Sequence, residues 1–259
     1  MALDTQTVVE VRALEKALEE VEKNFGTMKC MVSGDGRPNQ IWTKFRSWLL
    51  KSVRRVYDNK EIALNCGNML RDCIRFPTLA KYVLESASFV LFFKFVELPN
   101  FDVASDAFST FKDLLTKHGT VVSEFLTAHY DEFFDLYEKL LTSPNYVTRR
   151  QSLKLLSEFL LETPNSHIMK RYILEVRYLK VMMTLLKDSS KNIQISAFHI
   201  FKIFVANPNK PREVKVILAK NHEKLTELLE NLSAGKGDED EQFEEEKELI
   251  IAEIERALG

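Results

Sequence analysis

The chain has 259 residues, of which 45% are hydrophobic, so it can bury a substantial core and is not disordered throughout. Its 36 Lys and Arg nearly balance its 38 Asp and Glu, which excludes a global field that would draw the protein to nucleic acid or to an anionic membrane. With 8 Gly and 7 Pro it has too few turn formers for a β-sandwich or barrel, and the composition favours helices.

The cysteines and the N-terminal residues indicate the cellular compartment of the protein. Cys30, Cys66 and Cys73 form no CxxC pair and have no ligand histidines near them in the sequence, so we expect reduced thiols rather than disulfides or a zinc site. The first ten residues lack a charged region followed by an apolar one, and no run of residues is long enough to cross a bilayer. The sequence therefore predicts a cytoplasmic protein, with the nucleus as an alternative location, and no contact with membranes.

The first predicted element is an amphipathic helix over residues 7–32, where apolar residues recur at three- and four-residue steps among Glu and Lys. Turn formers between Ser33 and Pro38 end this helix. The segment that follows, residues 40–56, contains two Trp and five basic residues but no acidic residue, and it does not match its neighbours.

From Asn59 onward, helix patterns alternate with turns, several of which contain proline, and no stretch alternates with period two. The expected helices cover residues 59–75, 77–85, 87–96, 101–117, 121–141, 146–161, 166–173, 176–187, 191–206 and 210–231. We predict four regions along the chain. They are an N-terminal amphipathic helix at 1–36, a basic linker at 37–56, helical repeats at 57–232, and an acidic linker with a C-terminal helix at 233–259.

An internal repeat is the most informative feature of the sequence. When the repeats are aligned, small residues share one column and large apolar residues share another. In both columns, successive members are separated by 41, 45 and 45 residues along the chain. The small column holds Cys66, Ala107, Ser152 and Ala197, and the large column holds Leu70, Phe111, Leu156 and Phe201. Periods of about 40–47 residues are typical of armadillo and HEAT units, which bury their apolar faces only by stacking on one another. The sequence therefore predicts an all-α, armadillo- or HEAT-like, right-handed helical-repeat solenoid.

No pattern indicates catalysis. The five histidines fall in different predicted helices, and the glycines at 34–36 lack the third glycine and the lysine of a phosphate-binding loop. An EF-hand starting at Asp238 would need glycine at its sixth position, which Phe243 occupies. We interpret Asp131 and Asp135, one helical turn apart, as solvated charges. The sequence thus predicts neither an enzyme nor a cofactor or metal site.

Basic residues in two predicted helices raise the hypothesis of an RNA-binding repeat protein. They are Arg149, Arg150, Lys154, Lys170 and Arg171. A code that reads one base per repeat needs polar readers that recur, yet the column of Arg150 holds Ser105 and Ile195. The basic pair Arg150 and Lys154, one turn apart and near Tyr146, is therefore better interpreted as one local patch for a protein partner, and RNA binding stays an alternative.

From Asn59 to the end, the chain resembles the calcium-binding protein 39 family, the Mo-twenty-five scaffold proteins. The matching strings are EIALNCGNMLRDCI, FDVASDAFSTFKDLLTKH, NYVTRRQSLKLL, SKNIQISAFHIFKIFVANPNK and DEDEQFEEEK. The resemblance implies a non-catalytic, armadillo-like scaffold that is monomeric until it binds its partner. That partner would be a protein kinase or pseudokinase of the sterile-twenty, germinal-centre type, which the scaffold activates allosterically.

The resemblance also implies two sites. A concave kinase-binding surface would include Phe101, Tyr146, Arg150 and Lys154, and a pocket for a Trp-Glu-Phe type tail of the partner would include Met183, Lys220 and Lys224. The residues alone leave simpler interpretations open, because the Phe and the Met fit a core equally well and the basic residues fit ordinary surface charge. Thr163 and Ser166 depart from the family, whose members can carry Arg and Phe there, so the choice of partner stays open.

A larger departure lies at Gln40 to Arg55, where family members have further helices. One codon choice that is allowed for this segment, when translated in a different reading frame, encodes a sequence like that of the family's own helix. We therefore hypothesise that the transcript is alternatively spliced or mispredicted, with a shifted reading frame and a shortened N-terminal part. Helix 59–75 would then lose its N-terminal neighbour. An inert truncated isoform is therefore a third interpretation, beside the kinase scaffold and the RNA-binding repeat.

Overall fold

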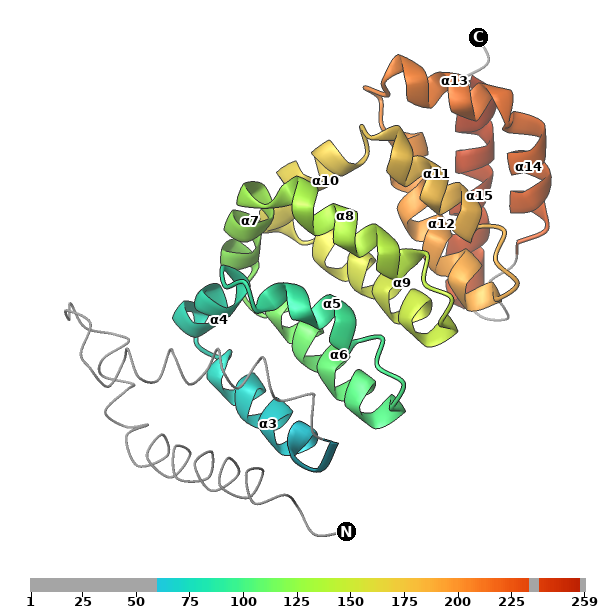
Figure 1. Cartoon of the computed structure of the whole chain (residues 1–259). Helices are drawn as coiled ribbons and strands as arrows, with labels where there is room; N and C mark the ends of the chain where they lie inside the picture. Colours follow the sequence, from blue (N-terminus) through green and yellow to red (C-terminus); the bar gives the residue numbers. More distant parts are fainter. Residues whose placement is uncertain (1–59, 233–237, 257–259) are drawn as a thin grey trace. The chain divides into compact units, whose positions relative to one another are not determined.

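The computed structural model describes residues 60–232 and 238–256, and every element in these ranges is a helix (Figure 1). The predicted N-terminal helix and the segment from Gln40 to Arg55 lie outside the described residues. The chain forms two compact units that divide after Leu114, and each is described by itself. No helix in the described ranges is both long enough and apolar enough to span a bilayer.

The first unit is built around phenylalanine rings. Its elements are α3 (Lys60–Cys73), α4 (Pro77–Leu84), the 3-10 helix η1 (Phe89–Leu91), α5 (Phe92–Phe95) and α6 (Phe101–Thr116), which crosses the division between the units. The ring of Phe111 on α6 stacks on Phe92 with centroids 6.2 Å apart and meets the edge of Phe93 at 5.1 Å. These aromatic contacts join α5 to α6 in one core.

A close approach between α3 and α6 explains one glycine. Arg71 on α3 forms an ion pair of 2.6 Å with Asp106 on α6 and donates a hydrogen bond of 2.9 Å to Thr110. A Cβ atom on Gly67 would lie 1.8 Å from Oδ2 of Asp106, so any larger residue there would displace this carboxylate. Glycine at this position allows the ion pair to form.

Cys73 at the end of α3 is buried, with 5% of its surface exposed. Burial raises the pKa of its thiol to about 12, and the nearby Asp72 adds to this effect. The thiol is therefore protonated at neutral pH and a poor nucleophile.

The second unit consists of three triplets of helices that stack in order. The first triplet is α7 (Gly119–Ala128), α8 (Tyr130–Leu141) and α9 (Tyr146–Leu160). The second triplet, which follows the 3-10 helix η2 (Thr163–Asn165), is α10 (Ser166–Tyr172), α11 (Val176–Leu185) and α12 (Lys191–Ala206). The third triplet is α13 (Arg212–Lys220), α14 (His222–Glu230) and α15 (Asp238–Arg256). Equivalent helices pack together, since α7 contacts α10, α8 contacts α11, and α9 contacts α12, which in turn contacts α15 (Figure 1).

Both columns of the predicted repeat are buried where the structure describes them. Ala107, Ser152 and Ala197 have no exposed surface, and the large apolar column is equally inaccessible. Cys66 lies among the residues whose burial is not described. The all-α, helical-repeat fold class is confirmed.

Two predicted helices are wrong because each is divided by a break without proline or glycine. The helix expected at 121–141 is interrupted at His129, which has φ −121° and ψ 27°, and forms α7 and α8. The helix expected at 210–231 is interrupted at Asn221, whose amide donates a 2.7 Å hydrogen bond to the carbonyl of Ile217. A side chain that bonds to the backbone in this way competes with continued helix formation.

Polar contacts between triplets recur at the repeat period. The pairs Asp131 with Arg171 and Asp135 with Arg177 are separated by 40 and 42 residues, and each joins α8 to the next triplet. Both acids are exposed, as predicted. The interpretation as solvated charges therefore holds, and stacking adds a cationic partner to each acid.

The column of small buried residues predicts that a larger side chain at one of these positions destabilises the fold. Replacing the buried Ala197 with Leu should lower the free energy of unfolding by about 1–3 kcal/mol, because the added methylene groups have no space in the packed core around α12. Ala206 lies on the same helix but is exposed, so Ala206→Leu is a matched control that should change stability by less than about 0.5 kcal/mol. Urea denaturation of both variants measures this difference. Equal stabilities would contradict close packing at this column.

Candidate functional site

The exposed face of α9 carries three of the residues that the resemblance singled out. Tyr146, Arg150 and Lys154 follow one another at four-residue steps, and all three are exposed, with 39% of Tyr146 accessible. Residues at this spacing lie on one side of a helix, so their side chains form a single stripe. The opposite side of α9 is anchored in the core by Leu153, Leu156 and Phe159.

The beginning of α9 is fixed by its own cap. The side chain of Asn145 accepts hydrogen bonds from the backbone N–H groups of Val147 at 2.9 Å and Thr148 at 3.4 Å. Such a cap satisfies backbone donors that would otherwise lack partners, so it defines where the helix starts. Tyr146, the first helical residue, therefore has a fixed backbone position.

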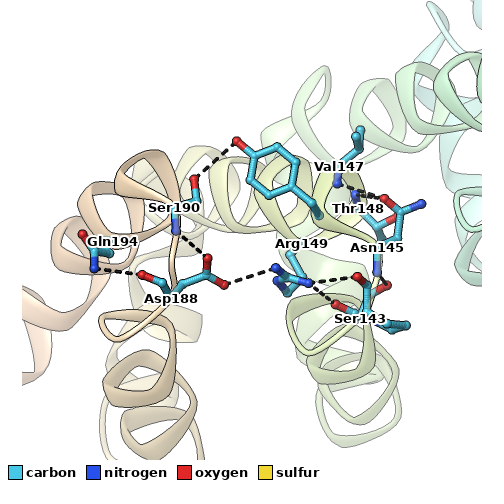
Figure 2. A network of polar contacts seen from close by, with 10 residues as sticks. Ser143, Asn145, Val147, Thr148, Arg149, Asp188, Ser190 and Gln194 are labelled. Carbon is cyan, nitrogen blue, oxygen red and sulfur yellow. Dashed lines mark hydrogen bonds and ion pairs between the residues drawn. The ribbon is translucent and has the colours of Figure 1, made fainter.

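Arg149 connects the loop before α9 to the loop before α12 (Figure 2). Its guanidinium donates hydrogen bonds to the carbonyl groups of Ser143 at 2.8 Å and Pro144 at 3.1 Å, both in the loop before α9. The same group forms an ion pair of 3.2 Å with Asp188 in the loop before α12. We call this arrangement the loop clamp. It is largely inaccessible, since the two side chains of the ion pair are 20% and 12% exposed.

The loop clamp extends to Tyr146 through the start of α12. Asp188 accepts a hydrogen bond of 2.9 Å from the N–H of Ser190, and the Ser190 hydroxyl lies 3.4 Å from that of Tyr146 (Figure 2). Hydrogen bonds from Ser190 and Asn192 lower the pKa of the Tyr146 phenol, and the positive charge of Arg150 acts in the same direction. The orientation of the exposed ring is therefore coupled to the packing of two successive triplets.

Phe101 lies in the first unit and is described apart from α9. It is the first residue of α6 and is 65% exposed, so it is a surface residue and not part of the core. The side chain of Asn100 accepts a hydrogen bond of 3.0 Å from the N–H of Val103, which stabilises this end of the helix.

The residues expected to form a tail pocket lie on three helices. Met183 on α11 is only 9% exposed, whereas Lys220 ends α13 and Lys224 lies in α14, and both lysines are exposed. The helix expected at 210–231 would have carried both lysines, but the break at Asn221 places them on two different helices. Since α11 packs against α13, the helix of Met183 adjoins the helix that ends in Lys220.

The basic residues behind the RNA hypothesis are not equivalent. Arg149 belongs to the loop clamp, and Arg171 pairs with Asp131 at 2.6 Å while its guanidinium lies 3.6 Å from the centre of the Tyr130 ring. Two of the five cations are thus neutralised by neighbours within the fold, which weakens the case for a continuous basic track.

The structure also shows what the sequence interpretation missed. The roles of Arg149 and Asp188 were not anticipated. The sequence does contain a signal for their pairing, since Asp188 follows Arg149 by nearly one repeat length. Among residues 60–232 and 238–256, no group of three or more His, Cys, Asp or Glu side chains is arranged to hold a metal ion. The acidic run after Gly237 forms the first turns of α15.

Comparison with known proteins identifies the family. The sequence profile described as Mo25-like matches residues 40–257, which is most of the chain. The chain belongs to the Mo25-like family. The helical-repeat architecture described above is the fold of that family. Its membership of the family identifies the protein as a scaffold-type protein.

The Mo25-like relatives come from distant organisms. The degreening-related gene dee76 protein of Auxenochlorella protothecoides is 47% identical over 251 residues, which cover 97% of this chain and 78% of the relative. Two proteins called calcium-binding protein 39-like, from Homo sapiens and Mus musculus, are 48% and 54% identical over 236 residues, which cover 91% of this chain and 70% of each relative.

The loop clamp predicts that adjacent arginines have different roles. Arg149→Met should lower the free energy of unfolding by about 1–3 kcal/mol, because it leaves the shielded Asp188 carboxylate without its cation. A double-mutant cycle with Asp188→Asn, measured by urea denaturation, should give a coupling energy of about 0.5–3 kcal/mol. Arg150→Met removes an exposed neighbour on the same helix and should leave stability nearly unchanged. If the two arginines contribute equally, the clamp does not stabilise the stack.

Proposed function

We propose that this protein is a non-catalytic scaffold that binds a protein kinase or pseudokinase of the sterile-twenty, germinal-centre type and activates it allosterically. The observation that carries the proposal is the stripe of Tyr146, Arg150 and Lys154, which is exposed while the adjacent Arg149 is used for packing. A polar stripe on a rigid helix, centred on a tyrosine and an arginine, has the composition of a binding hot spot.

The stripe combines features that suit a folded protein partner. Tyrosine provides a large contact area with little loss of conformational freedom, and arginine provides several hydrogen-bond donors in a planar group. Since the loop clamp orients Tyr146, little conformational entropy would be lost when a partner binds. Phe101 would add an exposed aromatic contact from the first unit.

Activation follows if the scaffold binds one kinase conformation better than the other. A ligand shifts an equilibrium only by its difference in affinity for the two states, so a tenfold preference for the active state corresponds to about 1.4 kcal/mol. A rigid surface is suited to this task because it does not adapt to the inactive conformation. No catalytic group of the scaffold is needed.

A second contact would involve Met183, Lys220 and Lys224 with an extended Trp-Glu-Phe type tail of the partner. The thioether of methionine packs well against an indole ring, and the two lysines would meet the tail's carboxylates. Because Met183 is only slightly accessible, we propose that it forms the floor of the contact and that the exposed lysines provide its charged rim. An intracellular location is part of the same proposal.

Charge reversal tests the stripe. Arg150→Glu combined with Lys154→Glu should weaken binding of a sterile-twenty-type kinase domain by about tenfold or more, because repulsion replaces two favourable contacts. Stimulation of the kinase should fall in parallel. Binding is measured by surface plasmon resonance and stimulation by the rate of substrate phosphorylation. Lys139→Glu with Lys170→Glu makes the same change in net charge at exposed positions on α8 and α10 and should have little effect.

Two results would contradict this proposal. Equal weakening by the control pair would show that net charge alone governs binding. An unmodified chain that neither binds nor stimulates any kinase of this class would favour the inert isoform.

The tail contact is tested with a peptide that ends in Trp-Glu-Phe. Lys220→Glu with Lys224→Glu should weaken its binding in calorimetry by about tenfold, because the peptide carboxylates then face like charges. Met183→Ala should also weaken binding. Because it removes a buried side chain, it should also lower the free energy of unfolding by about 2–5 kcal/mol. Its binding is therefore compared with that of the unmodified chain at a temperature where both proteins stay folded. Undiminished affinity in the lysine variant would exclude this site.

A further inference from the structure

The outward side of α13 carries two cations with an apolar side chain between them. Arg212, Val216 and Lys220 follow one another at four-residue steps and are all exposed, with 40% of Val216 accessible. Residues at this spacing lie on one side of a helix. The opposite side of α13 is anchored in the core by Val214 and Leu218, which have no exposed surface. We call Arg212, Val216 and Lys220 the α13 face.

Other lysines of the third triplet are used for packing. Lys210, in the loop before α13, forms an ion pair of 2.9 Å with Glu253 on α15. Lys247 on α15 donates a hydrogen bond of 2.9 Å to the carbonyl of Leu232. The side chains of these two lysines are only 6% and 7% exposed. By contrast, neither cation of the α13 face forms an ion pair with any acid in the part of the chain that the structure describes. Their charges are available to a ligand.

The whole of α13 has a surplus of positive charge. Its nine residues include Arg212, Lys215 and Lys220 but one acid, Glu213. Glu213 lies in the first turn, where an anion is favourable because the N-terminal end of a helix is positive. Arg212 lies in the same turn, where a cation is unfavourable. Helix stability therefore does not account for Arg212, whereas an anionic ligand would.

The spacing of the α13 face suits an extended segment. At a rise of about 1.5 Å per residue, Arg212 and Lys220 lie about 12 Å apart along the helix, with Val216 midway. Alternate side chains of an extended segment lie on the same side at steps of about 6.6 Å, so three of them span about 13 Å. The long side chains of arginine and lysine can absorb the remaining difference. Three alternate residues of one segment can thus meet all three positions.

We propose that the α13 face binds an acidic, extended stretch of the partner's tail, directly before its Trp-Glu-Phe type end. A carboxylate of this stretch would pair with Arg212, an apolar side chain would cover Val216, and a second carboxylate would share Lys220. The tail contact and the α13 face have Lys220 in common, so a segment that leaves the tail contact along α13 reaches Val216 next and then Arg212. The order acid, apolar, acid at alternate positions is the chemistry that this surface selects.

This inference rests on the proposed function, because it assumes the tail contact at Met183, Lys220 and Lys224. It goes further in assigning Arg212 and Val216 as specificity-determining residues. A basic stretch before the tail end would place like charges against Arg212, so the face discriminates between tails that share the same last three residues.

Two peptides test the proposal with the full-length chain. Both end in Trp-Glu-Phe. The neutral peptide has only uncharged residues before this ending, and the acidic peptide has glutamate, leucine and glutamate at alternate positions there. In calorimetry at about 150 mM salt, where distant charges are screened, the acidic peptide should bind about tenfold more tightly than the neutral one. Arg212→Gln with Val216→Ser should remove most of this gain and leave the affinity for the neutral peptide unchanged.

Lys215→Gln is the matched control, since Lys215 is exposed on the same helix but points about 100° away from Val216. It removes the same charge as Arg212→Gln and should keep the gain. The proposal is overturned if the acidic peptide binds no more tightly than the neutral one, if the control loses the gain equally, or if the variant of the α13 face keeps it. In each of these cases, binding of the neutral peptide leaves the proposed tail contact intact. Failure of both peptides to bind would refute the tail contact and the α13 face together.

Discussion

The second unit depends on one constraint, which is that a single triplet of helices cannot bury its own apolar face. The packing of α9 on α12 and of α12 on α15 supplies the missing surface, and residues without exposed area, such as Ser152 and Ala197, allow these helices to approach closely. The exposed stripe and the loop clamp both lie where the first triplet meets the second.

Much of the fold follows from the sequence because its signals are local or periodic. Helices that end near proline, such as α9 and α12, were predicted within a residue or two, and the small and large columns identified the buried seam. The breaks at His129 and Asn221 could not be predicted in the same way, because neither involves proline or glycine. They depend on backbone geometry and on hydrogen bonds such as that from Asn221 to Ile217, which become visible only in three dimensions.

The candidate site was only partly predictable for a related reason. The resemblance to a family pointed to Tyr146, Arg150 and Lys154, but it did not distinguish exposed residues from buried ones. The contrast between Arg149 and Arg150 requires knowledge of which loop lies beside α9, since Asp188 is 39 residues further along the chain. The groove between Lys154 on α9 and Ile195 on α12 likewise needs two helices from different triplets, and no property of α9 alone reveals the wall that α12 contributes.

The ion pairs between triplets have a mechanical consequence. Each pair, such as Asp131 with Arg171 or Lys202 with Glu246, joins one triplet to the next and spans 40 to 44 residues. Each pair therefore opposes the sliding of one triplet along the next. The shape of the surface that a partner meets is therefore set jointly by these pairs and by the packed core beneath them.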